Sequence, residues 1–195
     1  MVRKGDIIYN PSGRQTVTFI RTAQDTQGLL LQTDITIAPG GKLLHSYMHV
    51  HPKQTEIITV KSGVLVATVN GKKEIYKVGD VITIPPGVAH KLEIFGVAEE
   101  LHFICEMKPA LCTEILYETI LALPQYGLQG KGHWISLLQV SLTLNKYKNH
   151  FYLTAYPIWL QKLTFFLLSP LALLTGYKAQ LSYRKEHKQG MVLWQ

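Results

Sequence analysis

The segment His49-Val50-His51-Pro52-Lys53-Gln54-Thr55-Glu56 brings two histidines and a carboxylate together within one short stretch. His49 and His51 are two residues apart, and on a β-strand this spacing places both imidazoles on the same face. Pro52 ends that strand, and Glu56 begins the next one, which we predict over residues 56–60. The Glu56 carboxylate can therefore return to the two imidazoles.

A fourth donor is available at His90, which follows the rigid turn Pro85-Pro86-Gly87. Three neutral imidazoles and one carboxylate suit a divalent transition metal. An octahedral ion held by these four groups would keep two positions for water or substrate, and metal catalysis requires such open positions. In the competing interpretation His49 and His51 are solvated strand residues, which is the more common case for an isolated His-x-His pair.

The residues around this segment resemble the two sequence motifs of the cupin superfamily. The first motif is supplied by Gly41, His49, His51, Glu56 and Gly63, and the second by Gly79, Pro85, Gly87 and His90. The chain departs from the motifs in two places. The spacer between Gly41 and His49 is longer than usual, and Ile94 stands where the second motif has asparagine.

The resemblance implies a mainly β fold, an antiparallel double-stranded β-helix of the jelly-roll or cupin type, with its core motifs in residues 27–107. It also implies a metal inside the barrel, held by His49, His51, Glu56 and His90. Iron, manganese, zinc, nickel and copper all accept such ligands, so the identity of the metal stays open. Cupins are often dimers, and a homodimer is therefore expected.

The residue pattern changes from strand-like to helix-like near residue 110. Up to Lys108, short segments rich in β-branched residues alternate with turns, and Asn70-Gly71 is a strong hairpin signal. The first 26 residues predict an added hairpin. We expect residues 1–110 to form the β-barrel and residues 111–195 to form a helical, hydrophobic and basic extension.

Three helical segments are predicted in the extension. The first is capped by Thr113 and ends before Pro124, the second runs from Trp134 to about Lys148, and the third covers residues 158–176 and is broken by Pro170.

The apolar stretch 151–177 allows more than one interpretation. Its uninterrupted apolar part is shorter than the roughly 20 residues that a membrane-spanning helix needs. The helices could cover the barrel or a partner subunit, which we favour. Residues 151–188 could instead contact a membrane surface peripherally. Basic and aromatic residues that suit lipid headgroups are Trp159, Tyr177, Lys178, Arg184, Lys185 and Lys188.

Three further residues are candidates for the pocket around the metal. Tyr47 has the strand parity of His49 and could line the pocket mouth. Gln54 lies between the ligands and either bonds one of them or is an exposed turn residue. His102 either points into the pocket or is a hydrogen-bonded histidine of the barrel wall, which is the more common case. The two cysteines, Cys105 and Cys112, are expected to be buried and inert.

Composition narrows the classes of protein. The 195 residues are 47% hydrophobic and 17% charged, which disfavours disorder. Two cysteines cannot form a disulfide framework, and the N-terminal residues show no signal peptide, so we expect a cytoplasmic location. The net charge of +7 is concentrated in the extension, but no basic stripe with stacking aromatics marks a nucleic-acid site.

Two functions follow from these residues, and the sequence leaves open whether the protein is an enzyme. In the first, the barrel uses its metal to act on a small organic molecule, by oxygenation, isomerisation or decarboxylation. In the second, it is a non-catalytic barrel that binds or senses a small ligand while the tail docks to a partner subunit or a membrane.

Overall fold

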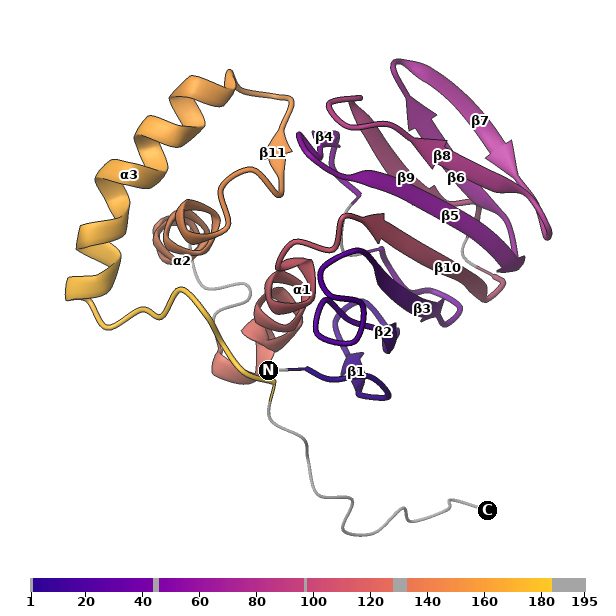
Figure 1. Ribbon diagram of the computed structural model, residues 1–195, viewed down its shortest axis with the longest axis horizontal. Helices are drawn as coiled ribbons and strands as arrows, with labels where there is room; N and C mark the ends of the chain where they lie inside the picture. Colours follow the sequence, from indigo (N-terminus) through magenta and orange to yellow (C-terminus); the bar gives the residue numbers. More distant parts are fainter. Residues whose placement is uncertain (1, 44–45, 97, 128–132, 184–195) are drawn as a thin grey trace, which may run out of the picture.

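Two antiparallel sheets form most of the computed structural model, which describes residues 2–43, 46–96, 98–127 and 133–183 (Figure 1). The first sheet has the strand order β1-β2-β3-β10-β5-β8, and the second has the order β11-β4-β9-β6-β7. The first sheet contains β1 (Ile7–Asn10), β2 (Gln15–Arg21), β3 (Leu31–Ile37), β10 (Leu101–Lys108), β5 (Thr55–Ser62) and β8 (Val81–Ile84). The second contains β11 (Tyr152–Leu153), β4 (His49–Val50), β9 (His90–Ile94), β6 (Leu65–Val69) and β7 (Lys72–Tyr76). We call the unit made by β1–β10 the barrel.

Alternation of side chains explains how the barrel encloses its core. In β3 every second residue is buried from Leu31 to Ile37, and β10 follows the same period from Leu101 to Met107. β10 pairs with both β3 and β5, so it lies in the middle of the first sheet. The mainly β, antiparallel fold is confirmed.

The predicted turns lie where the sequence signals them. Asn70 and Gly71 have φ values of 49° and 80°, as a type I′ turn requires, and they join β6 to β7. The N-terminal hairpin is also present as β1 and β2. Gly63 has φ 73°, and a Cβ there would lie 2.3 Å from the Glu100 carbonyl oxygen, so this motif position admits no side chain.

Helices follow the barrel, as expected. They are α1 (Thr113–Ala122), a short 3₁₀ segment η1 (Leu123–Tyr126), α2 (His133–Lys146) and α3 (Ile158–Leu174). Two details of the prediction were wrong. Thr113 is the first helical residue rather than the cap. α3 continues through Pro170, where the missing proline N–H removes one backbone hydrogen bond of the helix.

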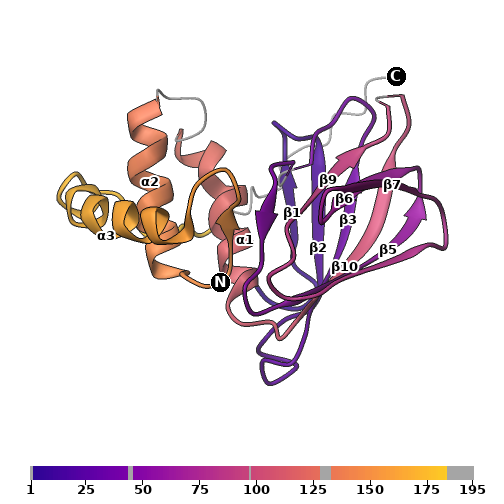
Figure 2. The same ribbon diagram turned by 90° about the horizontal axis from the view of Figure 1, so that it is seen from above.

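The helices gather at one end of the barrel, with α1 between the strands and the α2–α3 pair (Figures 1 and 2). Tyr117 and Leu121 of α1 belong to the main hydrophobic core. A second core joins α1, α2 and α3 through Leu116, Leu144 and Phe165. The division of the chain at residue 110 stays a prediction, and α1 packs as part of the barrel's own core.

The apolar residues of α3 are only partly buried. The buried face of this helix consists of Gln161, Phe165, Ser169 and Ala172, while most of its leucines are exposed. The apolar face of α3 is therefore not covered by the barrel, and its burial against a partner subunit stays a prediction. Across the described ranges, no helix combines the length and the hydropathy needed to cross a membrane.

Candidate metal centre

The four predicted ligands come from both sheets and meet in the interior. His49 in β4 lies directly opposite His90 in β9, His51 follows β4, and Glu56 is the second residue of β5 in the other sheet. All four side chains are buried, and one ligand atom from each lies within 4.8 Å of the others. The strand parity expected for His49 and His51 therefore holds, although β4 itself ends at Val50.

Backbone carbonyls orient the three imidazoles. The Nδ1 atoms of His49, His51 and His90 lie 2.7, 2.6 and 2.9 Å from the carbonyl oxygens of Tyr47, His150 and Val88. A carbonyl oxygen only accepts hydrogen bonds, so each Nδ1 carries the proton. In the neutral rings each Nε2 then carries a lone pair, which is the form that binds a metal.

Charge in the cluster favours a cation. Burial acts to raise the pKa of Glu56, but the surrounding imidazoles outweigh it and lower this pKa to about 2. Burial lowers the pKa of His51, and Glu56 offsets this only in part. Burial also acts to lower the pKa of His90, but the adjacent carboxylate raises it overall. An ionised carboxylate therefore faces the three imidazoles in the buried cluster.

The contact between His90 and Glu56 indicates that the centre needs a proton or a cation. His90 Nε2 lies 2.9 Å from Glu56 Oε2, and both atoms are buried. With Nδ1–H directed at Val88, two lone-pair atoms face each other unless a proton or a cation lies between them. The buried three-histidine, one-glutamate cluster thus suits a divalent metal.

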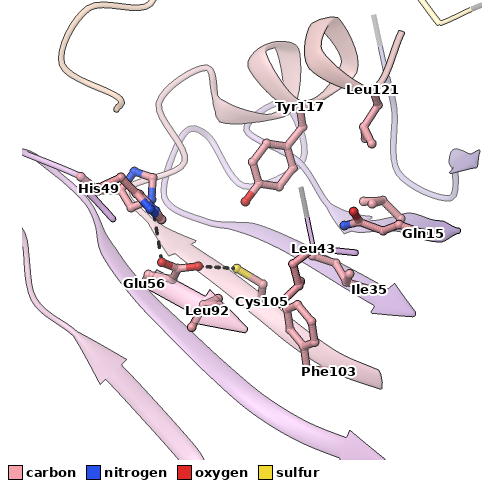
Figure 3. A pocket seen from close by; sticks show the side chains of 12 residues that line it. Gln15, Ile35, Leu43, His49, Glu56, Leu92, Phe103, Cys105, Tyr117 and Leu121 are labelled. Carbon is pink, nitrogen blue, oxygen red and sulfur yellow. Dashed lines mark hydrogen bonds and ion pairs between the residues drawn. The ribbon is translucent and has the colours of Figure 1, made fainter. Parts of the chain in front are cut away.

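Two neighbours that we did not predict lie beside the carboxylate (Figure 3). The Cys105 thiol donates to Glu56 Oε1 at 3.4 Å, and burial raises the pKa of this thiol well above its usual value. Tyr117 of α1 extends toward the same cavity, and burial likewise raises the pKa of its phenol. Cys105 is buried and protonated, as expected, whereas Cys112 is exposed, so burial was wrongly expected for it.

Of the three pocket candidates, Tyr47 borders the cavity beside His51 on the side of the helices, whereas Gln54 and His102 line neither cavity at the cluster. Tyr47 is 72% exposed, and it contributes its backbone carbonyl to His49. Gln54 is buried but bonds no imidazole, because its amide donates to Thr113 Oγ1 at the start of α1 and to two nearby carbonyls. His102 is a histidine of the barrel wall, with Nε2 2.8 Å from Asp34 Oδ1.

The helical extension also contributes to the centre. His150 supplies the carbonyl that orients His51, and the Phe151 ring stacks on His49 with centroids 4.8 Å apart. β11 then pairs with β4, placing Tyr152 opposite Val50 and Leu153 opposite His49. No local motif could have indicated these contacts, because they join residues about a hundred positions apart.

Comparison with known proteins agrees with this arrangement. Residues 33–105 match the family model described as a cupin domain. This segment contains the four clustered side chains but not the helices. No curated protein matches the chain.

Several solved structures share parts of the fold. A predicted oxalate decarboxylase from Thermotoga maritima is 23% identical, with 56% of this chain and 99% of that chain covered and a TM-score of 0.46. A cupin-like protein from the same organism is 26% identical over 56% and 80% of the two chains, with a TM-score of 0.44. An RmlC-like cupin from Shewanella frigidimarina is 19% identical over 54% and 85%, with a TM-score of 0.43.

Proposed function

The barrel of this chain belongs to the cupin superfamily, and from this premise we propose that it holds one divalent transition metal that binds a small organic molecule. His49, His51, Glu56 and His90 are the ligands. The observation that carries the proposal is the direction of the three Nδ1 hydrogen bonds, which leave three Nε2 atoms and a carboxylate converging in a buried space.

A bound ion would act as a Lewis acid on a carbonyl, carboxylate or enediol oxygen of the organic molecule. The protein's own groups prepare the site for it. The carbonyls of Tyr47, Val88 and His150 fix the rings, and the Cys105 thiol donates to Glu56 Oε1 and leaves Oε2 directed at the centre. Such a site supports oxygenase-like or isomerase-like chemistry on a polarised substrate.

The alternative function is a barrel that binds or senses the same class of molecule without converting it. Its support is the absence of any clear general base beside the cluster among the described residues, since the Cys105 thiol and Tyr117 phenol are both held protonated by burial. Turnover of a panel of small oxo acids, enediols and catechols by the metal-loaded protein would favour an enzyme. Binding without turnover would favour the sensing barrel.

Elemental analysis tests the metal site. We expect near-stoichiometric metal in the wild type and loss of metal in His49→Ala and His90→Ala. His102→Ala is the matched control, because this histidine bonds Asp34 away from the cluster and should leave the metal content unchanged. Unchanged metal in both cluster variants would refute the proposal.

A further inference from the structure

A second cavity, of about 260 Å³, adjoins the metal centre on the side of the helices. We call it the helical chamber. It lies between α1, α2 and the segment that leads into β11, and its walls include Leu116, Ile120, Val140, Leu144, Phe151 and His51. Apart from Tyr47 and His51, its lining residues lie outside the segment matched by the cupin family model.

The cavity inside the barrel is much smaller than the chamber. It has a volume of about 30 Å³, which is the share of roughly one water molecule in the liquid. The cavity inside the barrel therefore offers far less room for an organic molecule than the chamber does. A ligand whose oxygen atom reaches the ion must therefore place the rest of its atoms in adjoining space.

The chamber adjoins the metal centre directly. His51 and Tyr117 line both cavities, so the two spaces meet at these side chains. Phe151 also lines the chamber while it stacks on the His49 ring. A molecule in the chamber therefore contacts groups that touch the ligand histidines.

The walls of the chamber indicate what it would accept. Among the described residues, no Lys, Arg, Asp or Glu lines it. The Gln139 amide is already engaged with Thr143 Oγ1 and the Lys178 carbonyl, which leaves Oε1 as a buried acceptor without a partner in the described ranges. Such walls suit alkyl or aromatic groups and offer little to a sugar or a phosphate.

We propose that the helical chamber binds the apolar part of an amphipathic ligand, a carboxylic acid or related oxygen chelator with an alkyl or aryl tail, while its head binds the ion. This inference rests on the proposed metal function. It names the substrate class of that site, and it assigns the extension a role in choosing it.

Alkyl hydroxamates of increasing length test the proposal on the full-length, Zn(II)-loaded protein. Their common head chelates zinc, so only the tail varies between acetohydroxamate, butanohydroxamate, hexanohydroxamate and octanohydroxamate. By calorimetry we expect affinity to rise about three- to fourfold per methylene until the chamber is full. Affinity that does not change with chain length would overturn the chamber while leaving the metal site intact.

Filling the chamber provides the matched test. Leu144→Trp should abolish the gain with chain length and keep acetohydroxamate binding, whereas Leu29→Trp, at an exposed position on the barrel, should change neither. Val140→Trp is the second variant should Leu144→Trp lose its circular-dichroism spectrum. A chain-length gain that survives a folded chamber variant would also overturn the proposal. If acetohydroxamate fails to bind the zinc-loaded wild type, the proposed function itself fails.

A separate observation concerns the outer face of α3. In a helix at the surface of a water-soluble protein, apolar residues face inward and polar residues face outward. In α3 the order is reversed, because Gln161 and Ser169 are buried while Phe166 is 66% and Leu174 is 85% exposed. Trp159, Leu163 and Leu167 lie on the same exposed face.

The charges near α3 have one sign. Between Glu118 and Glu186 the sequence contains no acidic residue, while it contains six lysines. Four of them, Lys146, Lys148, Lys162 and Lys178, are exposed in the structure. Arg184, Lys185 and Lys188, which are also predicted to suit lipid headgroups, lie outside the described residues. Two copies meeting through this face would bring basic surfaces together, which is unfavourable, whereas an anionic surface is complementary.

We infer that α3 lies in the interface of a bilayer that contains anionic lipids, with its apolar face among the acyl chains and the lysines near the headgroups. The helix has 17 residues, which is long enough to lie in the interface. This docking does not depend on the metal, so its test is independent of the chamber.

Vesicle sedimentation tests the docking. The full-length protein should sediment with phosphatidylcholine–phosphatidylglycerol vesicles far more than with phosphatidylcholine alone, and high salt should weaken this binding. The double variant Phe166→Gln/Leu167→Gln should lose at least about tenfold in vesicle affinity. The control Val78→Gln/Val81→Gln changes exposed apolar residues on the barrel and should bind as the wild type does.

Two results would overturn the lipid assignment. One is equal sedimentation of the wild type and the Phe166→Gln/Leu167→Gln variant with anionic vesicles. The other is a homodimer, seen by analytical ultracentrifugation, that the same variant dissociates. The second result would assign the exposed face of α3 to another copy of the chain.

Discussion

β3 in the barrel and α3 in the extension are both rich in apolar residues, but they place them in opposite directions. β3 buries Leu31, Ile35 and Ile37, and three of its four polar residues lie at the more exposed positions, Thr33 being the buried one. α3 buries a glutamine and a serine and exposes most of its leucines. The barrel therefore buries most of its apolar residues within the chain, whereas α3 leaves most of its apolar residues exposed, which is the basis for the docking proposed for it.

Truncating one phenylalanine in each region should give the largest difference in the free energy of unfolding. Phe103 is 2% exposed in the barrel core, so Phe103→Ala should lower the free energy of unfolding by about 3–5 kcal/mol. Phe166→Ala on the outer face of α3 should change it by no more than about 0.5 kcal/mol. Urea unfolding of both variants in the absence of lipid makes the comparison. A large loss with Phe166→Ala would mean that α3 is covered within the protein.

The metal centre should respond next most strongly. Glu56→Gln keeps the shape of the side chain but removes the one negative charge in the cluster. Loss of an outer hydrogen-bond partner costs about 10- to 100-fold in metal affinity, so loss of this ligand should exceed about 100-fold. Competition with a coloured chelator measures the change. Glu106→Gln, on β10 but bonded to Gln32, is the matched control and should retain wild-type affinity.

A smaller effect tests whether the extension supports the barrel. Phe151 stacks on His49, so Phe151→Ala should free this ring and weaken metal binding by about tenfold, at the low end of the range for supporting contacts. Phe95→Ala, at an exposed position on the barrel, provides the control. Equal metal affinity in the two variants would show that the centre is independent of the extension.

The smallest expected effect concerns the wall histidine. His102 and Asp34 are both about one-third exposed, and solvent weakens such a pair. His102→Gln should therefore change the free energy of unfolding by less than about 1 kcal/mol and leave metal affinity unaltered. A drop in metal affinity would instead indicate that His102 contacts the pocket, which was one of its two predicted positions.

Much of the barrel could be predicted because its signals are local. Strand parity brought His49 and His51 to one face, and the Asn70-Gly71 turn set a hairpin. The convergence of His90 with them followed from the motif spacing rather than from local pattern. The structure brings these groups together, and their role as ligands stays a prediction.

The details that escaped prediction depend on packing between distant segments. Gln54 looked like a turn residue or a partner of the ligands, but α1 docks over it and takes its amide. Pro170 predicted a broken helix, yet packing of α3 on α2 holds the helix through it. The homodimer, the cytoplasmic location and the absence of nucleic-acid binding also remain predictions, because nothing in the fold tests them.

The bond between His51 Nδ1 and the His150 carbonyl has a consequence for biosynthesis. The strands up to Lys108 leave the ribosome well before residue 150 does, so the nascent barrel has its imidazoles but lacks the group that orients one of them. If the cluster holds the proposed ion, full affinity for it would arise only after the extension has been translated and has docked. A ribosome-bound chain truncated before residue 150 would hold its ion loosely, and the completed chain would retain it.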